Sequence, residues 1–313
     1  MKKFAVILIR ALMWLPARLP LKLHYACSSV IAWLLRSVFR YRRDVVMTNL
    51  SRSFPEKKYK ELTRIADASY RHLADLIVEA VWFGGSSLRR LHRAHIVEYT
   101  NPEVLNRMMT EGKGAVVMTS HCGNWELTGG ILAYNFKEEA PWAMTRDSYV
   151  VVYKKMKSAV WDEVLARNRK YPMPGYENYI ETYDVMRFIV RHRRQKMCYL
   201  FPTDQAPYKG AAWQLVPSFM NQPTPTMTGG AAVAHKLGCG VLFMNYRKVC
   251  RGRYEIDFIP VCEDASALTP LQIMERYYAL LESLIQQDPT NYNWTHRRWK
   301  KRVAAPEQEE QGK

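Results

Sequence analysis

The sequence predicts an α/β fold, in which helices flank a mixed, largely parallel sheet and membrane-associated helices precede it. The first observation is alternation, because short apolar segments and segments of helical periodicity follow one another between residues 101 and 287. The second is size, since 313 residues with 48% hydrophobic composition can bury a large core. The third is the N-terminus, where two apolar runs carry interspersed basic residues.

Residues 1–45 are expected to form amphipathic helices that lie on or dip into a bilayer. Arg10 interrupts the first apolar run and Arg36 the second, so neither provides the roughly 20 apolar residues that a spanning helix needs. No Ala-x-Ala cleavage site follows the first run, which argues against a signal peptide. An ordinary core helix is the alternative, but Trp14 and Trp33 favour the membrane interface. The first helix carries an apolar stripe formed by Phe4, Ile7, Leu8, Ala11 and Leu15.

A long helix is expected next, because apolar residues recur at helical spacing through "YKELTRIADASYRHLADLIVEAVWF". Ser53 and Pro55 predict its start, and Gly84 and Gly85 predict its end. The helices before residue 90 are expected to form a cap on the α/β layer.

Alternating elements are expected in the rest of the chain. One helix has Asn101 as its N-cap, Pro102 at its first position and Gly112 as its C-cap, and a short buried strand over 114–120 follows it. The later strands are expected over 141–146 (weak), 196–202, 240–249 and 253–261. The later helices are expected over 148–170, 179–195, 224–238 and 270–287.

The charge balance points to an anionic partner. Lys and Arg number 46 against 29 Asp and Glu, a net charge of +17 that suits either nucleic acid or a membrane surface. No zinc-finger, RNP-like or recognition-helix pattern is present, so a basic, non-catalytic nucleic-acid binder is the less favoured alternative. The six cysteines include no Cys-x-x-Cys pair, and no cluster has metal-ligand spacing. No metal is therefore expected, and no cofactor is expected either.

The segment "TSHCGNWELTGG" contains the strongest candidate for chemistry. Five positions along one helix correspond to roughly 500°, so His121 and Glu126 would point to different faces of a single helix. We therefore expect His121 at the end of a strand, a turn at Gly123 and Asn124, and Glu126 in the first turn of the next helix. Glu126 would then reach back to one imidazole nitrogen and leave the other free as a base. Cys122 is an alternative nucleophile, but a small packed residue is the favoured interpretation.

His-x4-Glu spacing alone is weak evidence, because a histidine that caps a turn is the commoner case. The flanking residues add to it: "SHCGNWEL" resembles the His-x4-Asp/Glu motif of the lipid A biosynthesis acyltransferases. The segments "NLSRSFPEKKYKEL", "FPTDQAPYKG", "PTPTMTGGAAVAHKLG" and "YNWTHRRWK" are similar to further segments of that family. The resemblance extends from about residue 15 to residue 302, which is nearly the whole chain.

This resemblance implies a glycerol-3-phosphate-acyltransferase-like fold and a specific reaction. A fatty acyl chain would pass from an acyl carrier protein thioester to a hydroxyl of a Kdo-bearing lipid A precursor, an anionic glycolipid, at the cytoplasmic face of the inner membrane. His121 would be the general base and Glu126 its orienting partner. Another membrane lipid, glycolipid or aminolipid, is the alternative acceptor. The expected domains are 1–45 (membrane-associated helices), 46–303 (acyltransferase) and 304–313 (a disordered tail).

Several polar residues are expected in the substrate site. Lys154 stands where the family usually carries an arginine, so it keeps the charge but not the bidentate geometry. The alternatives are that Asp204 only caps a turn and that Arg297 and Arg298 only solvate the end of the chain. The residues expected to contact the substrates are Asn124, Lys154, Asp204, Gln205, Arg297 and Arg298.

Overall fold

A seven-stranded sheet forms the centre of the computed structural model, which describes residues 2–300. The strand order is β1-β9-β8-β2-β5-β3-β4, and every neighbouring pair is parallel except the antiparallel hairpin of β8 and β9. The predicted α/β fold with a largely parallel sheet is therefore confirmed. Its strands are β1 (Val97–Tyr99), β2 (Ala115–Thr119), β3 (Tyr149–Tyr153), β4 (Tyr179–Glu181), β5 (Cys198–Pro202), β8 (Gly240–Cys250) and β9 (Arg253–Cys262).

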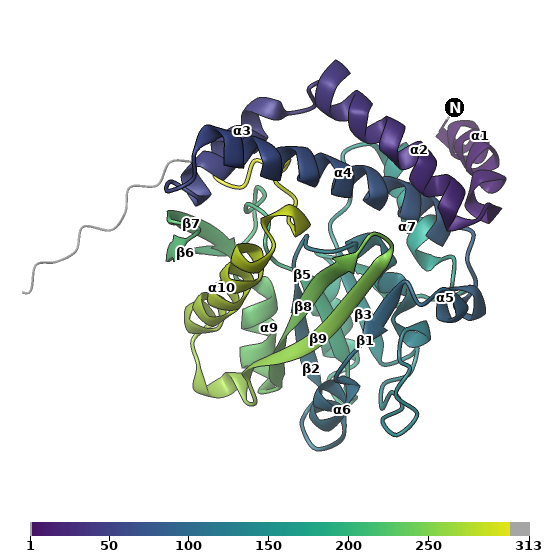
Figure 1. Ribbon diagram of the computed structural model, residues 1–313. Helices are drawn as coiled ribbons and strands as arrows, with labels where there is room; N and C mark the ends of the chain where they lie inside the picture. The colour runs from purple at the N-terminus through teal and green to yellow at the C-terminus, as the bar shows by residue number, and fades with distance from the viewer. Residues whose placement is uncertain (1, 301–313) are drawn as a thin grey trace, which may run out of the picture.

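Helices surround this sheet, and Figure 1 shows α2, α3 and α4 crossing one end of it, with α9 and α10 on one flank. The α-helices are α1 (Lys2–Trp14), α2 (Leu21–Trp33), α3 (Arg43–Ser53), α4 (Tyr59–Phe83), α5 (Leu88–Ala94), α6 (Pro102–Thr110), α7 (Ala159–Lys170), α8 (Val185–Arg191), α9 (Gly229–Leu237) and α10 (Pro270–Gln287). Shorter helical turns are η1 (Pro16–Arg18), η2 (Leu34–Val38), η3 (Trp125–Ala133), η4 (Ala265–Ala267) and η5 (Pro289–Asn291).

The core lies on both faces of the sheet, which the central strand β2 illustrates. All five of its residues are buried. Val116 and Met118 pack into one apolar cluster, whereas Ala115 and Val117 pack into the other. Successive side chains of a strand point to opposite faces, so a strand covered on both sides is apolar at every position. This explains why "AVVMT" shows no polar alternation.

Three segments predicted as single helices are each a strand followed by a helix. Residues 148–170 form β3 and then α7, residues 179–195 form β4 and then α8, and residues 224–238 belong to β7 (Gln222–Met227) and α9. For β3 the prediction was wrong because a buried parallel strand has a continuous apolar run, which periodicity cannot distinguish from a buried helix. The strand β4 has only three residues, and β7 is the antiparallel partner of β6 and contains two prolines. In the first case Ser158 accepts a hydrogen bond from the Trp161 amide and so starts the helix.

Other expected boundaries also differ. Residues 141–146 form no strand. Ser53 is the last residue of α3, and α4 starts after Lys58, whose amide donates to the Glu61 carboxylate. The antiparallel pair of β6 (Trp213–Phe219) with β7 was not predicted. Both strands contain proline, which weakens a sequence-based strand assignment.

The two N-terminal helices expose a large apolar surface. Its members include Phe4 (70% exposed), Ile7 (65%), Leu12 (68%), Trp14 (57%), Leu23 (52%), Val30 (57%) and Trp33 (53%). Within residues 2–300 no single helix is long and apolar enough to cross a membrane, although Lys2–Arg18 and Leu21–Val38 together, bent by 120°, meet the criteria of length and composition. The predicted disordered tail, 304–313, lies outside the described residues.

Candidate active site

Two loops meet at the carboxyl edge of the sheet, one after β2 and one after β5. These strands are parallel neighbours, and Thr119 stands opposite Pro202 in their register. The Thr203 amide donates to the Thr119 carbonyl (3.1 Å) and extends the pairing by one step. His121, two residues after Thr119, and Asp204, the residue after Thr203, are thereby brought together at the edge where open α/β sheets hold their ligands.

Asp204 is the hydrogen-bond partner of the His121 imidazole. Its Oδ1 lies 2.7 Å from His121 Nδ1, and its Oδ2 accepts from the His121 backbone amide at 3.1 Å. The carboxylate is buried, whereas the imidazole is 16% exposed. Burial alone would raise the pKa of Asp204, but the charge and hydrogen bonds of His121 outweigh it and hold that pKa below its usual value. An ionised Asp204 fixes the tautomer with a proton on Nδ1, which leaves a lone pair on Nε2.

That lone pair faces the side chain of Gln205, because Gln205 Nε2 lies 2.9 Å from His121 Nε2. With Nδ1 protonated, the amide donates to the imidazole. The next residue, Ala206, donates its amide to His296 Nε2 at 3.2 Å. Burial lowers the pKa of His296 to about 4, so its ring is neutral and can accept that hydrogen bond. The loop after β5 is therefore held on both sides by imidazole rings.

Glu126 does not bind the imidazole, so the predicted hydrogen bond from Glu126 to His121 is wrong. Its carboxylate forms a bidentate pair with Arg169 of α7, with Nε–Oε2 at 2.7 Å and Nη2–Oε1 at 2.5 Å. Burial would raise the pKa of Glu126, but the charge and hydrogen bonds of Arg169 outweigh it and keep that pKa low. The physical reason is that a guanidinium matches a carboxylate with two parallel hydrogen bonds, which an imidazole cannot offer.

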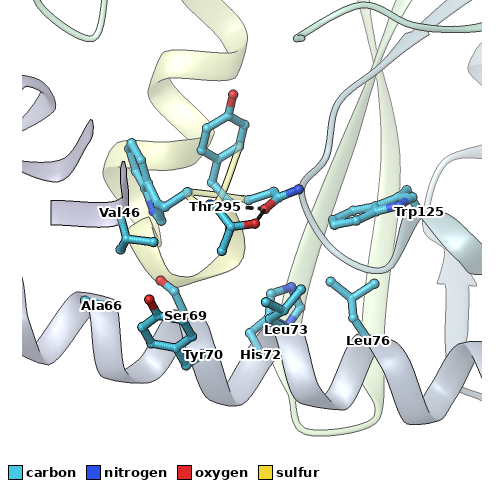
Figure 2. Close-up of a pocket in the computed structure, with 12 residues that line it drawn as sticks. Val46, Ala66, Ser69, Tyr70, His72, Leu73, Leu76, Trp125 and Thr295 are labelled. Carbon is cyan, nitrogen blue, oxygen red and sulfur yellow. Dashed lines mark hydrogen bonds between the residues drawn. The ribbon is translucent and has the colours of Figure 1, made fainter. Parts of the chain in front are cut away.

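Trp125 connects Glu126 to the imidazole. Its indole nitrogen donates to Glu126 Oε1 at 3.1 Å, and its ring meets the His121 ring edge-on, with centroids 4.8 Å apart. Trp125 also forms one end of a narrow cleft between α3, α4 and the C-terminal segment, shown in Figure 2. The cleft is lined mainly by apolar groups: Val46, Ala66, Ser69, Tyr70, His72, Leu73, Leu76, Trp125, Tyr292, Asn293, Trp294 and Thr295.

Asn124 is fully buried, so it faces the interior rather than a substrate. Its Oδ1 accepts from the Glu126 amide at 3.1 Å and caps η3, while its Nδ2 donates to Glu79 Oε2 at 2.7 Å. Both ends of the amide are thus used within the protein, which makes Asn124 a positioning residue. Cys122 is also buried, and burial raises the pKa of its thiol well above the usual range. A protonated, covered thiol is a poor nucleophile.

The three expected cations lie in different environments. Lys154 is partly exposed; its Nζ is 3.3 Å from Glu181 Oε1 and 3.6 Å from the centroid of the Tyr183 ring. Arg297 is exposed and pairs with Asp44 at 3.6 Å. Arg298 is buried instead, and its Nη2 donates to the Tyr278 hydroxyl at 2.7 Å. Although adjacent in sequence, Arg297 and Arg298 do not form one cluster, because their side chains bind different elements.

The C-terminal segment supports the loop after β2, which the sequence analysis did not anticipate. The Gly123 amide donates to Asn291 Oδ1 at 2.9 Å, and the Asn293 amide donates to the His121 carbonyl at 3.1 Å. Both asparagines lie within or just before "YNWTHRRWK", so the resemblance of that segment was the available signal. Arg169 was also missed, because it is one of many basic residues and its partner is distant in sequence.

The sequence profile of a family described as bacterial lipid A biosynthesis acyltransferase matches residues 1–301 of this chain. No curated protein matches the chain at a significant level. The matched range includes both loops of the site, the N-terminal helices and the C-terminal segment that contacts His121.

Proposed function

Because the chain belongs to the bacterial lipid A biosynthesis acyltransferase family, we propose that it carries a fatty acyl chain from an acyl carrier protein thioester to a hydroxyl of a Kdo-bearing lipid A precursor. The family makes the protein an acyltransferase of lipid A biosynthesis, whereas the donor and the acceptor are our inference. It also favours an enzyme over a nucleic-acid binder. The observation that carries the proposal is the imidazole of His121, which Asp204 orients at Nδ1 and which presents Nε2 toward Gln205.

The reaction we propose is a direct transfer. The acceptor hydroxyl takes the place of the Gln205 amide at His121 Nε2 and gives its proton to that nitrogen while its oxygen attacks the thioester carbonyl carbon. Asp204 stabilises the imidazolium that forms. The tetrahedral intermediate then expels the carrier thiolate, which takes the proton from Nε2, so the C–S bond is replaced by a C–O bond and the imidazole is restored.

The neighbouring groups suit this chemistry. Once displaced from Nε2, the Gln205 amide is a free donor for the oxyanion of the intermediate. Glu126 keeps its negative charge through Arg169, and it stabilises the imidazolium without a direct hydrogen bond. Glu126 also positions Trp125, whose ring forms one wall of the imidazole environment.

We assign the acyl chain to the cleft that Trp125 shares with α3 and α4 (Figure 2). The cleft is mainly apolar and starts at the ring that touches His121, which is the position that the carbon chain of a thioester requires. Lys154 is a candidate for the phosphates or carboxylates of the acceptor, because its ammonium remains partly exposed beside Tyr183 and Tyr208.

We place the protein at the cytoplasmic face of the inner membrane. The exposed apolar side chains of α1 and α2 support attachment to a bilayer, and a net charge of +17 supports attraction to anionic lipids. An acceptor glycolipid held in that bilayer could then reach the site laterally. Another glycolipid or aminolipid with an accessible hydroxyl is the second candidate acceptor.

The test uses purified protein in detergent with an acyl carrier protein thioester and a Kdo-bearing lipid A precursor, and mass spectrometry of the lipid. We expect one added acyl chain, no product with His121→Ala, and most of the activity with Cys122→Ala. Lipid A from cells without the gene should lack one acyl chain. An unchanged lipid A together with acylation of a different lipid would replace the acceptor, and activity in His121→Ala would refute the mechanism.

A further inference from the structure

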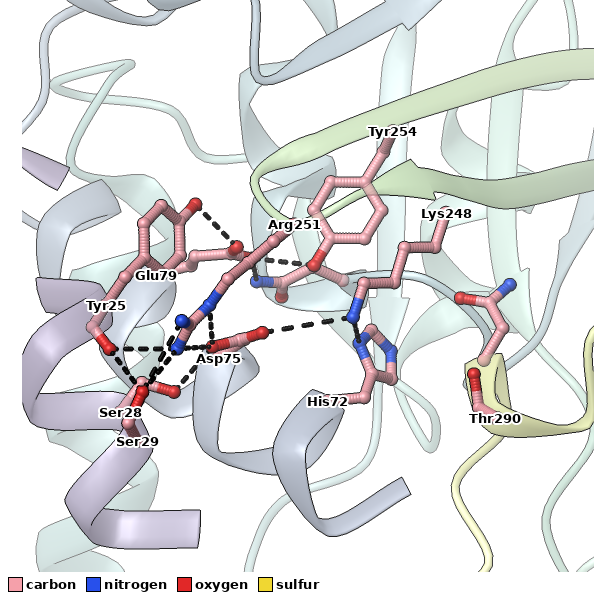
Figure 3. A network of polar contacts seen from close by, with 12 residues as sticks. Tyr25, Ser28, Ser29, His72, Asp75, Glu79, Lys248, Arg251, Tyr254 and Thr290 are labelled. Atoms are coloured by element: carbon pink, nitrogen blue, oxygen red, sulfur yellow. Dashed lines mark hydrogen bonds and ion pairs between the residues drawn. The ribbon is translucent and has the colours of Figure 1, made fainter. Parts of the chain in front are cut away.

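Two buried carboxylates stand one turn apart on α4 and bind the N-terminal helix α2. Asp75 is 2% exposed and accepts a hydrogen bond from the Ser28 hydroxyl at 2.5 Å. Glu79 is fully buried and accepts from the Tyr25 hydroxyl at 2.9 Å (Figure 3). Buried carboxylates are costly unless donors surround them, so their presence under α2 requires an explanation.

Glu79 extends this contact to the catalytic loop. Its Oε2 accepts from Asn124 Nδ2 at 2.7 Å and from the Tyr254 hydroxyl at 2.9 Å. Asn124 in turn accepts from the Glu126 amide and so fixes the start of η3 at Trp125, where the loop that contains His121 ends. A continuous series of hydrogen bonds therefore leads from Tyr25 on α2, through Glu79, to the loop of the proposed active site.

Asp75, by contrast, binds the β8–β9 hairpin. It binds Arg251 at 2.7 and 2.9 Å and lies 3.8 Å from Lys248, both at the end of the β8–β9 hairpin. No hydrogen bond of Asp75 reaches the loop directly. One indirect route passes from Lys248 to His72 (3.4 Å) and on to the Gly123 carbonyl (3.1 Å). Another passes through Arg251, which also donates to the Tyr25 backbone carbonyl (2.9 Å) and does not involve the Ser28 hydroxyl. Ser28 and Tyr25 thus each donate a hydrogen bond to a buried carboxylate of α4. Only the carboxylate that Tyr25 binds, Glu79, also binds the loop, through Asn124.

The opposite face of α2 is exposed and apolar. Leu23, Val30 and Trp33 are all more than half exposed, whereas Ser28 is fully buried. One helix therefore presents an apolar surface outward and holds the partner of Glu79 inward. A change in how this helix is seated would act on the Tyr25 hydroxyl and hence on the carboxylate that holds Asn124.

We propose that Glu79 is a positioning residue that ties α2 to the loop carrying His121 and Glu126, so that the N-terminal helix supports catalysis as well as attachment. This inference rests on the proposed acyl transfer. Its chemical requirement is an acceptor at position 79 that faces Asn124. The Tyr25 and Tyr254 hydroxyls can rotate to accept instead of donate, but the Asn124 amide can only donate from Nδ2.

That requirement separates two substitutions of Glu79. Glu79→Gln keeps an oxygen for Asn124, and its amide can donate to a rotated Tyr25 hydroxyl. Glu79→Leu fills a similar volume but offers no acceptor. In detergent solution, where attachment to a membrane does not limit the reaction, we expect Glu79→Gln to keep kcat within about threefold of the unsubstituted protein and Glu79→Leu to lower it by at least about tenfold, with KM little changed. Equal kcat for both variants, with both folded, would overturn the proposal.

A second pair of variants tests the contribution of α2. Tyr25→Phe and Ser28→Ala each remove one hydroxyl that α2 donates to a buried carboxylate of α4. We expect Tyr25→Phe to lower kcat by about threefold or more, while Ser28→Ala stays within about twofold even if both lower Tm to a similar extent. If the two variants lose activity in proportion to their loss of Tm, the contact is only structural and the proposal is wrong.

Amide hydrogen exchange provides a readout that needs no activity. Peptides that cover residues 121–128 should exchange faster in Tyr25→Phe and in Glu79→Leu than in Ser28→Ala, because only the first two loosen the hold on Asn124. Should the unsubstituted protein transfer no acyl chain, the proposed function fails while this comparison still decides whether Glu79 holds the loop. Identical exchange rates in all three variants would refute the proposal that Glu79 connects α2 to the loop that contains His121.

Discussion

At the scale of single residues, the site consists of one imidazole between two carboxylates with different duties. Asp204 contacts His121 directly through both the ring and the backbone. Glu126 is paired with Arg169 and reaches His121 only through the Trp125 ring. The direct contact with Asp204 selects the tautomer of His121. The indirect contact adds the negative charge of Glu126 near the imidazole and holds the Trp125 ring against it. Substitution of Asp204 and substitution of Glu126 should therefore lower kcat by different factors.

We expect Asp204→Asn to lower kcat by a factor on the order of 10³ or more, because an amide can stabilise the wrong tautomer and carries no charge for the imidazolium. Glu126→Gln should cost less, about 10- to 100-fold, because its amide can still accept from Trp125. Steady-state kinetics of the purified variants give both values. A larger loss in Glu126→Gln would mean that Glu126 moves onto the imidazole when substrate binds.

Gly123 places a backbone requirement on the same loop. Its φ is +60°, and a Cβ there would lie 2.3 Å from the Tyr246 ring. Gly210 has a similar φ of +84°, but a Cβ there would meet nothing within 4 Å. An alanine at Gly210 therefore adds backbone strain alone, whereas an alanine at Gly123 adds both backbone strain and a clash with the buried Tyr246 ring.

Gly123→Ala should lower the free energy of unfolding by about 3 kcal/mol or more and remove activity, because strain and a clash add together. Gly210→Ala should cost only about 1 kcal/mol. Denaturant unfolding of the two variants measures the difference. Equal losses would show that the Tyr246 ring moves aside without cost.

At the scale of elements, position in the sheet creates the site. The strands β2 and β5 are far apart in sequence but are paired in register, and their loops therefore meet. The helix α4 crosses above this edge, and His72 and Glu79 on it bind the Gly123 carbonyl and Asn124. Burial raises the pKa of Glu79 to about 7, which three donated hydrogen bonds only partly offset. This carboxyl therefore affects the stability of the cap.

The folded-state pKa of Glu79 lies above the ordinary value of a glutamate, so its contribution to stability is complete at low pH and is lost as the pH rises through about 7. Glu79→Gln removes this loss, and its free energy of unfolding relative to the unsubstituted protein should rise between pH 5 and pH 8, by an amount on the order of 3 kcal/mol. Unfolding curves at several pH values test this, and a constant difference would contradict it.

At the scale of the whole molecule, the exposed apolar surface and the candidate site belong to different elements. The exposed apolar residues belong to α1 and α2, whereas the candidate site lies in the loops that follow β2 and β5 (Figure 1 labels these elements). Since Ile7 and Leu12 are 65% and 68% exposed, charged residues there should not disturb the core. The proposed attachment to a membrane can therefore be tested by substitutions that leave the protein folded.

We expect Ile7→Glu with Leu12→Glu to release the protein from membranes into a salt wash, whereas the unsubstituted protein should require detergent. The double variant Gln286→Glu with Gln287→Glu changes the net charge equally at exposed positions of α10 and should stay bound. Fractionation followed by immunoblotting distinguishes them. Equal release of both variants would show that charge, rather than the apolar face of α1, controls attachment.

The sequence by itself determined the fold class, the strands β2, β5, β8 and β9 and the helices α4 and α10, and it singled out His121 as the candidate base. These elements have local signals, such as an apolar run between turn residues or helical periodicity. It could not separate β3 from α7, because no glycine or proline divides them and a buried strand lacks alternation.

The tertiary structure alone decided which carboxylate binds the imidazole. Glu126 is five residues from His121 and Asp204 is 83 residues away, yet Asp204 forms the contact. Parallel pairing of β2 with β5 brings together the ends of two segments that are distant in sequence. Arg169 of α7 binds the Glu126 carboxylate, which is then not available to His121. Spacing along a chain reports only local geometry, whereas the competition between an arginine and a histidine for one carboxylate depends on how helices and strands pack.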